Sequence, residues 1–184
     1  ESPRETAEMP EAMMRLGGDN WDNERESVVE RFKDWEKKPV DQRGPAPEIN
    51  SSLSRNLFAK VLKDYPWFQQ YDLALYVDGF LATEQNKSDE AFARFTRILT
   101  EFPNSRFVPD AHMARAEIYF AKPDYQTALA EYEEVLKFQD HTDLVGLALF
   151  KSAWCYWRLG NNDEATRRFV EVFKATDTTG RHVN

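Results

Sequence analysis

Apolar residues recur along this chain in steps of three and four, the spacing that places side chains on one face of an α-helix. The pattern itself repeats, because three segments of the same design begin at Leu73, Asp110 and Leu147, 37 residues apart. In each, an alanine precedes an aromatic residue by four positions; the pairs are Ala91–Phe95, Ala128–Tyr132 and Ala165–Phe169. No stretch shows a competing strand pattern. The chain is therefore predicted to be all-α and built from helical hairpins.

The repeat resembles the tetratricopeptide repeat (TPR), a helix–turn–helix unit of about 34 residues. The stretches "AFARF", "ALAEY" and "ATRRF" fit its A-x3-F element, and Pro103 stands where its closing proline belongs. Small residues occupy the tight position of the first helix: Gly79, Ala116 and Ala153. The resemblance implies a right-handed TPR superhelix, an α-solenoid, whose small residues let helices approach closely. Its aromatic residues then fill the gap between neighbouring units.

The pattern extends towards the N-terminus. Phe58 lies one offset before Phe95, which predicts a second helix over about residues 50–63. "PEAMMRLGGDNW" matches a first helix, and its apolar spacing continues to Trp35. We predict one long helix over about residues 10–38, with a break at Gly17–Gly18 as the alternative. The proline-rich segment that follows cannot sustain a helix and predicts a loop.

The predicted organisation has about four hairpins, the first of them enlarged. Residues 1–9 are expected to be disordered or extended, and residues 10–71 to form the enlarged hairpin. Three TPR units follow over 72–108, 109–145 and 146–184, the last of them including a C-terminal tail. Such arrays usually close with a polar helix that covers the last apolar face. None is recognisable after the fourth unit, so we expect a fragment of a longer repeat protein, or an end covered by a partner or a second copy.

Charge and composition exclude several function classes. A net charge of −8 argues against nucleic-acid binding, which needs a basic face. No apolar run approaches the length of a membrane span. Cys155, in "KSAWCYWRLG", takes the repeat position of Leu81 and Ile118 and is predicted to be a core residue, with no histidine on its helix to activate it.

The remaining titratable residues point to no catalytic or metal chemistry. His112 is alone on its helix, which is too few ligands for zinc. The acidic run that contains Glu131, Glu133 and Glu134 is predicted to be a solvated face, and Asp163 and Glu164 a helix start. We predict no catalytic residue, cofactor or metal, and an enzyme is the least favoured class.

TPR proteins line a concave groove with set positions of their first helices, and these can be carried over to this chain. The resulting candidate groove residues are Tyr76, Phe80, Met113, Glu117, Phe120, Phe150, Trp154, Trp157 and Arg158. So many apolar side chains are rarely left bare, which favours an apolar helix or extended peptide of a protein partner. The alternative is that the chain's own N-terminal helix, or a second copy in a homo-oligomer, fills the groove. A clamp for peptide carboxylates, as in chaperone-binding members, would need more cations than Arg115 and Arg158.

A finer resemblance concerns the junction "FPNSRFVPDA". It is similar to TPR proteins of the Gram-negative envelope, such as the outer-membrane assembly lipoprotein and the cell-division coordinator of cell-wall synthesis. Together with "PEAMMRLGG" and "SAWCYWRLG" it also resembles TPR proteins of the bacterial gliding motility machinery. These resemblances imply a non-enzymatic scaffold in the periplasm or at the outer membrane, whose partner is another subunit of an envelope complex.

Overall fold

The computed structural model describes residues 3–140 and 142–180, and all regular structure in that part of the chain is helical. The elements are α1 (Pro3–Glu36), a short 3-10 turn η1 (Val40–Gln42), α2 (Ser52–Asp64), α3 (Tyr71–Glu84), α4 (Ser88–Glu101), α5 (Val108–Ala121), α6 (Tyr125–Val135), α7 (Thr142–Arg158) and α8 (Asn162–Gly180). The predicted all-α solenoid of helical hairpins is confirmed.

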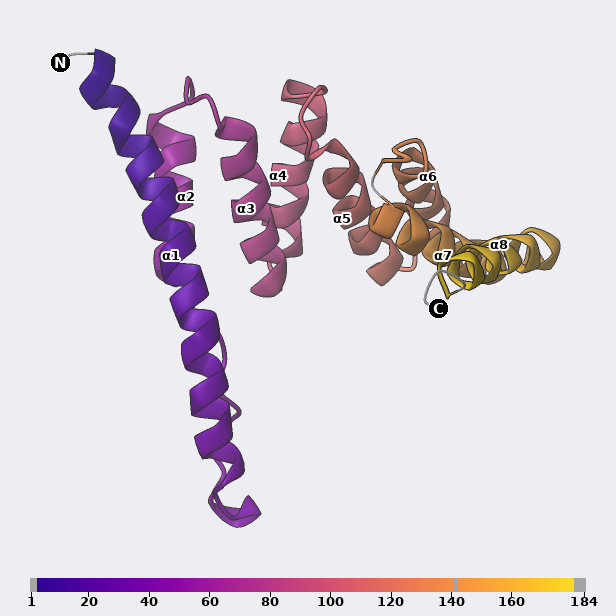
Figure 1. Ribbon diagram of the computed structural model, residues 1–184, viewed down its shortest axis with the longest axis horizontal. Helices are drawn as coiled ribbons and strands as arrows, with labels where there is room; N and C mark the ends of the chain where they lie inside the picture. The colour runs from indigo at the N-terminus through magenta and orange to yellow at the C-terminus, as the bar shows by residue number, and fades with distance from the viewer. Residues whose placement is uncertain (1–2, 141, 181–184) are drawn as a thin grey trace. The chain divides into compact units, whose positions relative to one another are not determined.

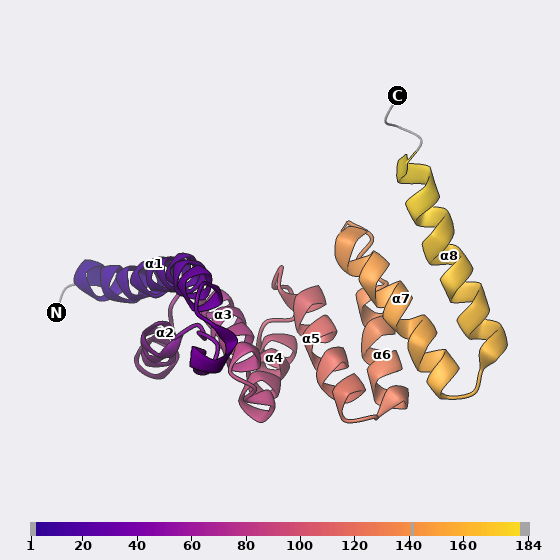
Figure 2. The same ribbon diagram turned by 90° about the horizontal axis from the view of Figure 1, so that it is seen from below.

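The helices form two compact units, which are described separately: unit 1, Glu1–Asn86, and unit 2, Lys87–Asn184. In unit 1, α2 packs against both α1 and α3. In unit 2, each helix from α4 to α8 packs against the next one (Figures 1 and 2). The boundary between the units falls inside the predicted repeat 72–108. The boundary lies there because α3 packs against the preceding helix α2, whereas α4 packs against the following helix α5.

The first helix is longer than predicted at its N-terminal end. It begins at Pro3, so the expectation that residues 1–9 are disordered or extended is wrong for the part that the structure describes. Pro3 takes the first-turn place that the sequence pattern assigned to Pro10, and the residues between them are mostly good helix formers. Further along, α1 runs without a break through Gly17 and Gly18, as predicted.

Gly17 fixes how closely α1 and α2 pack. A Cβ atom at Gly17 would lie 2.5 Å from Cε1 of the buried Phe58 ring, nearer than atoms can approach. Phe58 is the aromatic residue one offset before Phe95, so the pairing of a small residue with an aromatic one holds in this first hairpin. A Cβ at the neighbouring Gly18 would meet nothing within 4 Å.

Beyond α2, the C-terminal half of α1 continues as an arm, defined here as residues 22–51 (Figure 1). The segment after the helix runs back along it. The indole Nε1 of Trp35 donates to the carbonyl oxygen of Gly44 at 2.8 Å, and the backbone N–H of Asn50 donates to Glu24 at 3.1 Å. These two hydrogen bonds hold the returning segment against the C-terminal half of α1. Without that segment, this half of the helix would be a single unsupported helix.

The core of unit 2 lies between α5, α6 and α7. Its alanines at the tight positions, Ala116, Ala128 and Ala153, are fully buried, as the repeat pattern predicts. The last helix departs from that pattern. Phe173 is 73% exposed and Phe169 is half-buried, although the residues one offset earlier, Leu136 and Tyr132, are partly and fully buried. Tyr132 lies in α6, which packs against α5 and α7, whereas α8 packs against α7.

Candidate protein-binding surface

Helix α7 turns its large side chains outward and its small ones inward. Phe150, Trp154 and Trp157 follow one another at steps of four and three and are 39%, 37% and 48% exposed. On the opposite face Ala148, Ser152 and Cys155 are completely buried. Small residues let α7 approach α6 closely, and the bulky rings have room only on the outside. The same choice of residues thus produces both the tight core and the exposed rings.

The exposed rings of α7 support one another. The ring centroids of Trp154 and Trp157 are 5.3 Å apart and those of Phe150 and Trp154 are 6.3 Å apart, both edge to face. Phe169 of α8 packs edge-on against Trp154 at 5.7 Å. Edge-to-face pairs at these distances are favourable, so the rings hold each other in place. A partner that binds them therefore loses little freedom in ordering them.

Side chains at the ends of α5, α6 and α7 extend this cluster of rings. The ring of Phe120, near the end of α5, lies edge-on to Tyr125 of α6, 5.4 Å away. The guanidinium of Arg158 lies 5.7 Å from the ring centroid of Tyr125 and 5.2 Å from that of Trp157. We call Phe120, Tyr125, Phe150, Trp154, Trp157 and Arg158 together the aromatic surface of unit 2.

Glu117, a predicted groove residue, has a side chain that is 41% exposed and already bonded within the protein. The hydroxyl of Tyr132 donates to its Oε1 at 2.6 Å, and Nζ of Lys151 lies 2.8 Å from its Oε2. Burial, and then the bond to this carboxylate, raise the pKa of Tyr132. Lys151 also lies 5.1 Å from the ring centroid of Phe120. Glu117 thus ties α5, α6 and α7 together.

Two predictions about individual residues are corrected by the structure. Met113, predicted to line the groove, is 7% exposed and belongs to the core of unit 2, because α6 and α7 cover it. Glu131, predicted to lie on a solvated face, is 9% exposed. Its two oxygens contact Nδ1 of His112 at 2.7 Å and the guanidinium of Arg115 at 2.6 Å. These two partners on α5 compensate for the burial of the carboxylate.

Tyr76 and Phe80, the remaining groove candidates, belong to unit 1. Tyr76 is half-buried and Phe80 is 42% exposed. The ring of Phe80 lies edge-on to Trp21 of α1, with centroids 6.2 Å apart. In unit 1 the chain's own long helix therefore contacts a residue that the sequence assigned to partner binding.

Cys155 is a core residue, as predicted. Its side chain is completely buried, and burial, followed by the nearby Glu117 carboxylate, raises the pKa of the thiol to about 12. At neutral pH it stays protonated and is a poor nucleophile. A search of the described residues found no cluster of three or more His, Cys, Asp or Glu side chains placed to hold a metal ion.

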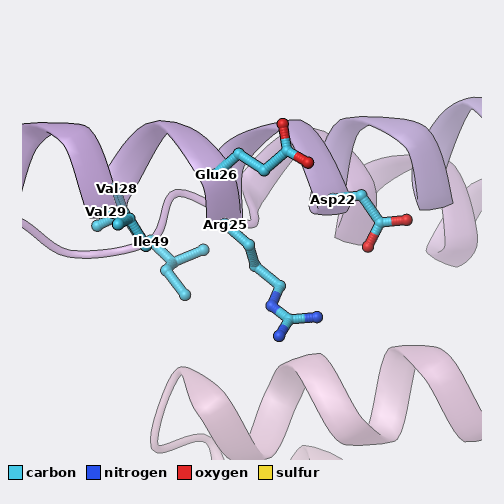
Figure 3. A pocket seen from close by; sticks show the side chains of 6 residues that line it. All are labelled: Asp22, Arg25, Glu26, Val28, Val29 and Ile49. Carbon is cyan, nitrogen blue, oxygen red and sulfur yellow. The ribbon is translucent and has the colours of Figure 1, made fainter.

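The pockets in the described part of unit 1 include two that the sequence did not suggest. One, of about 550 Å³, lies on the arm and combines Val28, Val29 and Ile49 with three charged residues, Asp22, Arg25 and Glu26 (Figure 3). The other, of about 400 Å³, lies between α1 and α3 above Phe58.

None of the helices described has the length and apolar content needed to cross a membrane.

Comparison with known proteins agrees with this architecture. The sequence profile of a family described as tetratricopeptide repeat matches residues 74–105 and 147–174. These segments contain the A-x3-F elements of the first and third predicted repeats and the rings of α7. A search of curated proteins found no match. The two matched segments, in an all-helical chain of packed hairpins, support a tetratricopeptide repeat protein.

Proposed function

We propose that this chain is a non-enzymatic scaffold that binds an apolar helix or peptide of a protein partner on the aromatic surface of unit 2. The observation that carries the proposal is the exposure of Phe150, Trp154 and Trp157 on one face of α7. Tetratricopeptide repeats generally mediate protein–protein interaction, and proteins built from them are typically scaffolds without catalytic activity.

Physical arguments support binding at these rings. Contiguous exposed apolar patches on soluble proteins often mark interaction sites. Tryptophan, tyrosine and arginine are enriched among the residues that dominate binding energy, and this surface combines Trp154, Trp157, Tyr125 and Arg158. The rings are already packed on one another, so the surface is preformed.

The partner is proposed to be another subunit of a bacterial envelope complex, in outer-membrane machinery or in gliding motility. The support is the resemblance of "FPNSRFVPDA" and "SAWCYWRLG" to repeat proteins of those systems. A periplasmic or outer-membrane-associated location follows from the same resemblance. A nucleic-acid partner is disfavoured by the net charge of −8.

A second candidate is a structural solenoid whose groove is filled by its own chain or by a second copy. The contact between Trp21 and Phe80 favours it in unit 1, because there α1 already touches a groove position. Removal of residues 1–49 tests this candidate. If α1 serves as the groove's own cover, circular dichroism and thermal melts will show that α2 and α3 lose their fold with it.

The proposed function is tested by capture from a detergent-treated envelope extract. Tagged wild-type protein is compared with a Trp154→Ala/Trp157→Ala variant and with Trp67→Ala. Trp67 is a matched control, because it is an exposed tryptophan of unit 1 that packs edge-on to Tyr65. Circular dichroism checks that all three proteins fold.

We expect at least one protein to be retained by the wild type and by Trp67→Ala but lost from the double variant. Cross-linking with a photoreactive residue in place of Phe150 should then join that protein to α7. Equal retention by all three proteins would show that the aromatic surface is not the binding site.

A further inference from the structure

Arg158 is the cation of the aromatic surface, and its position is fixed by two rings. Its guanidinium lies over Trp157 of its own helix and over Tyr125 of α6. A guanidinium stacked on rings uses its flat face for the contact and leaves its N–H groups, which point outward in the plane, able to donate. The residue is exposed, so these donors face solvent.

Three other cations of α7 and α8 differ from Arg158 in being paired with carboxylates. Lys151 is bound to Glu117 at 2.8 Å, and Arg168 is bound to Glu133 at 2.7 Å. Arg167 lies between Glu164 and Glu171. Among the residues that the structure describes, Arg158 has ring contacts and no carboxylate. The surface therefore presents one arginine that two rings hold in place and that has no carboxylate partner in the described part of the chain.

Resting on the proposed function, we propose that the bound segment carries an Asp or Glu next to an apolar or aromatic side chain. The carboxylate meets the free N–H edge of Arg158 while the apolar side chain packs on Trp157 and Trp154. Arginine and a carboxylate form two parallel, charge-assisted hydrogen bonds, which fix direction as well as adding affinity. The rings exclude water on one side of the pair and so strengthen it.

The recognition is local, because the chain as a whole repels acidic molecules. With a net charge of −8, the protein does not steer an acidic partner from a distance. A highly acidic segment would be repelled, whereas one carboxylate inside an apolar sequence meets Arg158 at contact range. The occupant is therefore an amphipathic segment with a single acidic position rather than an acidic tail.

The test uses a displayed library of random peptides of about 15 residues, four helical turns, selected on the full chain. Wild type, Arg158→Glu and Arg106→Glu are compared. Arg106 is the matched control, because it is also exposed and stacked on a ring, that of Phe107, without belonging to the aromatic surface. Circular dichroism verifies folding, and the affinities of synthesised winners are measured by fluorescence anisotropy.

We expect the wild type and Arg106→Glu to enrich peptides with an Asp or Glu at a fixed spacing from an aromatic or aliphatic residue. Changing that acid to its amide should weaken binding to the wild type about tenfold. The Arg158→Glu variant should enrich a Lys or Arg at the same spacing instead.

Two results would overturn the inference and are distinguishable. Apolar peptides enriched without an acidic position, bound equally by wild type and Arg158→Glu, would refute the role of Arg158 while leaving the proposed function in place. A wild-type selection that enriches no peptide at all would refute both, since the surface would then not bind peptide segments.

Discussion

One position of the first helix shows how the two units differ. At intervals of 37 residues it holds Asp78 in α3, Arg115 in α5 and Ser152 in α7. In unit 1, Asp78 is completely buried and lies 3.2 Å from the guanidinium of Arg55 on α2. In unit 2, the guanidinium of Arg115 lies 2.6 Å from the Glu131 carboxylate on α6 and 5.0 Å from the ring centroid of Phe92, which stands one offset after Arg55.

Ser152 gives a third solution at this position. Its hydroxyl donates to the carbonyl oxygen of Leu149 in its own helix at 2.8 Å, so it needs nothing from a neighbour. The comparison teaches that the repeat prescribes where a side chain packs but leaves its chemistry free. Unit 1 pairs Asp78 with Arg55 of the preceding helix, whereas unit 2 pairs Arg115 with Glu131 and places a small residue, Ser152, at the next repeat of the position.

The largest effect on stability is expected from Asp78→Ala, which would remove the ion pair between Asp78 and Arg55 in unit 1. It leaves the largely buried guanidinium of Arg55 without its carboxylate, a change that typically costs about 3–5 kcal/mol. Ser152→Ala at the equivalent position of unit 2 should cost under about 1.5 kcal/mol, because one hydrogen bond within a helix is lost. Urea unfolding followed by circular dichroism measures both. Equal losses of unfolding free energy in the two variants would show that the two positions do not differ as described.

A smaller effect is expected where α1 meets α2. Gly17→Ala forces a methyl group into the Phe58 ring and should destabilise unit 1 by about 1–3 kcal/mol. Gly18→Ala, which points into open space, should instead stabilise the helix by up to about 1 kcal/mol. Thermal melts of the two variants distinguish them. A stabilised Gly17→Ala protein would mean that α1 and α2 are not held at this close distance.

Alkaline pH should act on unit 2, which contains the only cysteine. The pKa of Cys155 is raised to about 12 in the folded state, so the unfolded thiol ionises first as pH rises. The free energy of unfolding should therefore fall from about pH 9 towards pH 12, by at most roughly 1.4 kcal/mol per pH unit from this group. The fall should be shallower in Cys155→Ala. Urea titrations at about pH 8 and pH 10 compare the two proteins. An unchanged slope would assign the sensitivity to other groups.

A small effect on stability is also expected at the aromatic surface. Trp157→Ala should cost less than about 1.5 kcal/mol, because nearly half of the side chain is already in water and one edge-to-face contact is lost. Differential scanning calorimetry checks this. A loss as large as that of Asp78→Ala would mean that the rings of α7 belong to the core and are not available to a partner.

The sequence predicted the elements that a repeat prescribes. The tight alanines and the buried Cys155 follow from the offset of 37 residues, because the same position meets the same neighbour in each hairpin. The close contact of Gly17 with Phe58 was not predicted, because the enlarged first hairpin does not keep that offset in its first helix. The start of α1 was not predictable from the apolar spacing, since Pro3 and Pro10 are equally suited to a first turn.

The sites were harder to predict because they depend on which neighbours are present. Tyr76, Met113 and Phe150 share one repeat position, yet only Met113 is buried, because α6 and α7 both cover it. The burial of Glu131 depends on His112 and Arg115, which lie on another helix. The spacing of apolar residues within one helix carries no information on partners supplied by a different one.

The arm of unit 1 has a mechanical consequence. From Gly17 to Glu36 the helix extends by about 29 Å at 1.5 Å per residue, and most of that length lies past α2. A rod of this length is a lever whose pivot is the contact of Gly17 with Phe58. A tilt of about 10° at the pivot moves the end of the helix by roughly 5 Å, given that rise per residue. A force applied at the end of the arm therefore acts with this leverage on the contact between Gly17 and Phe58.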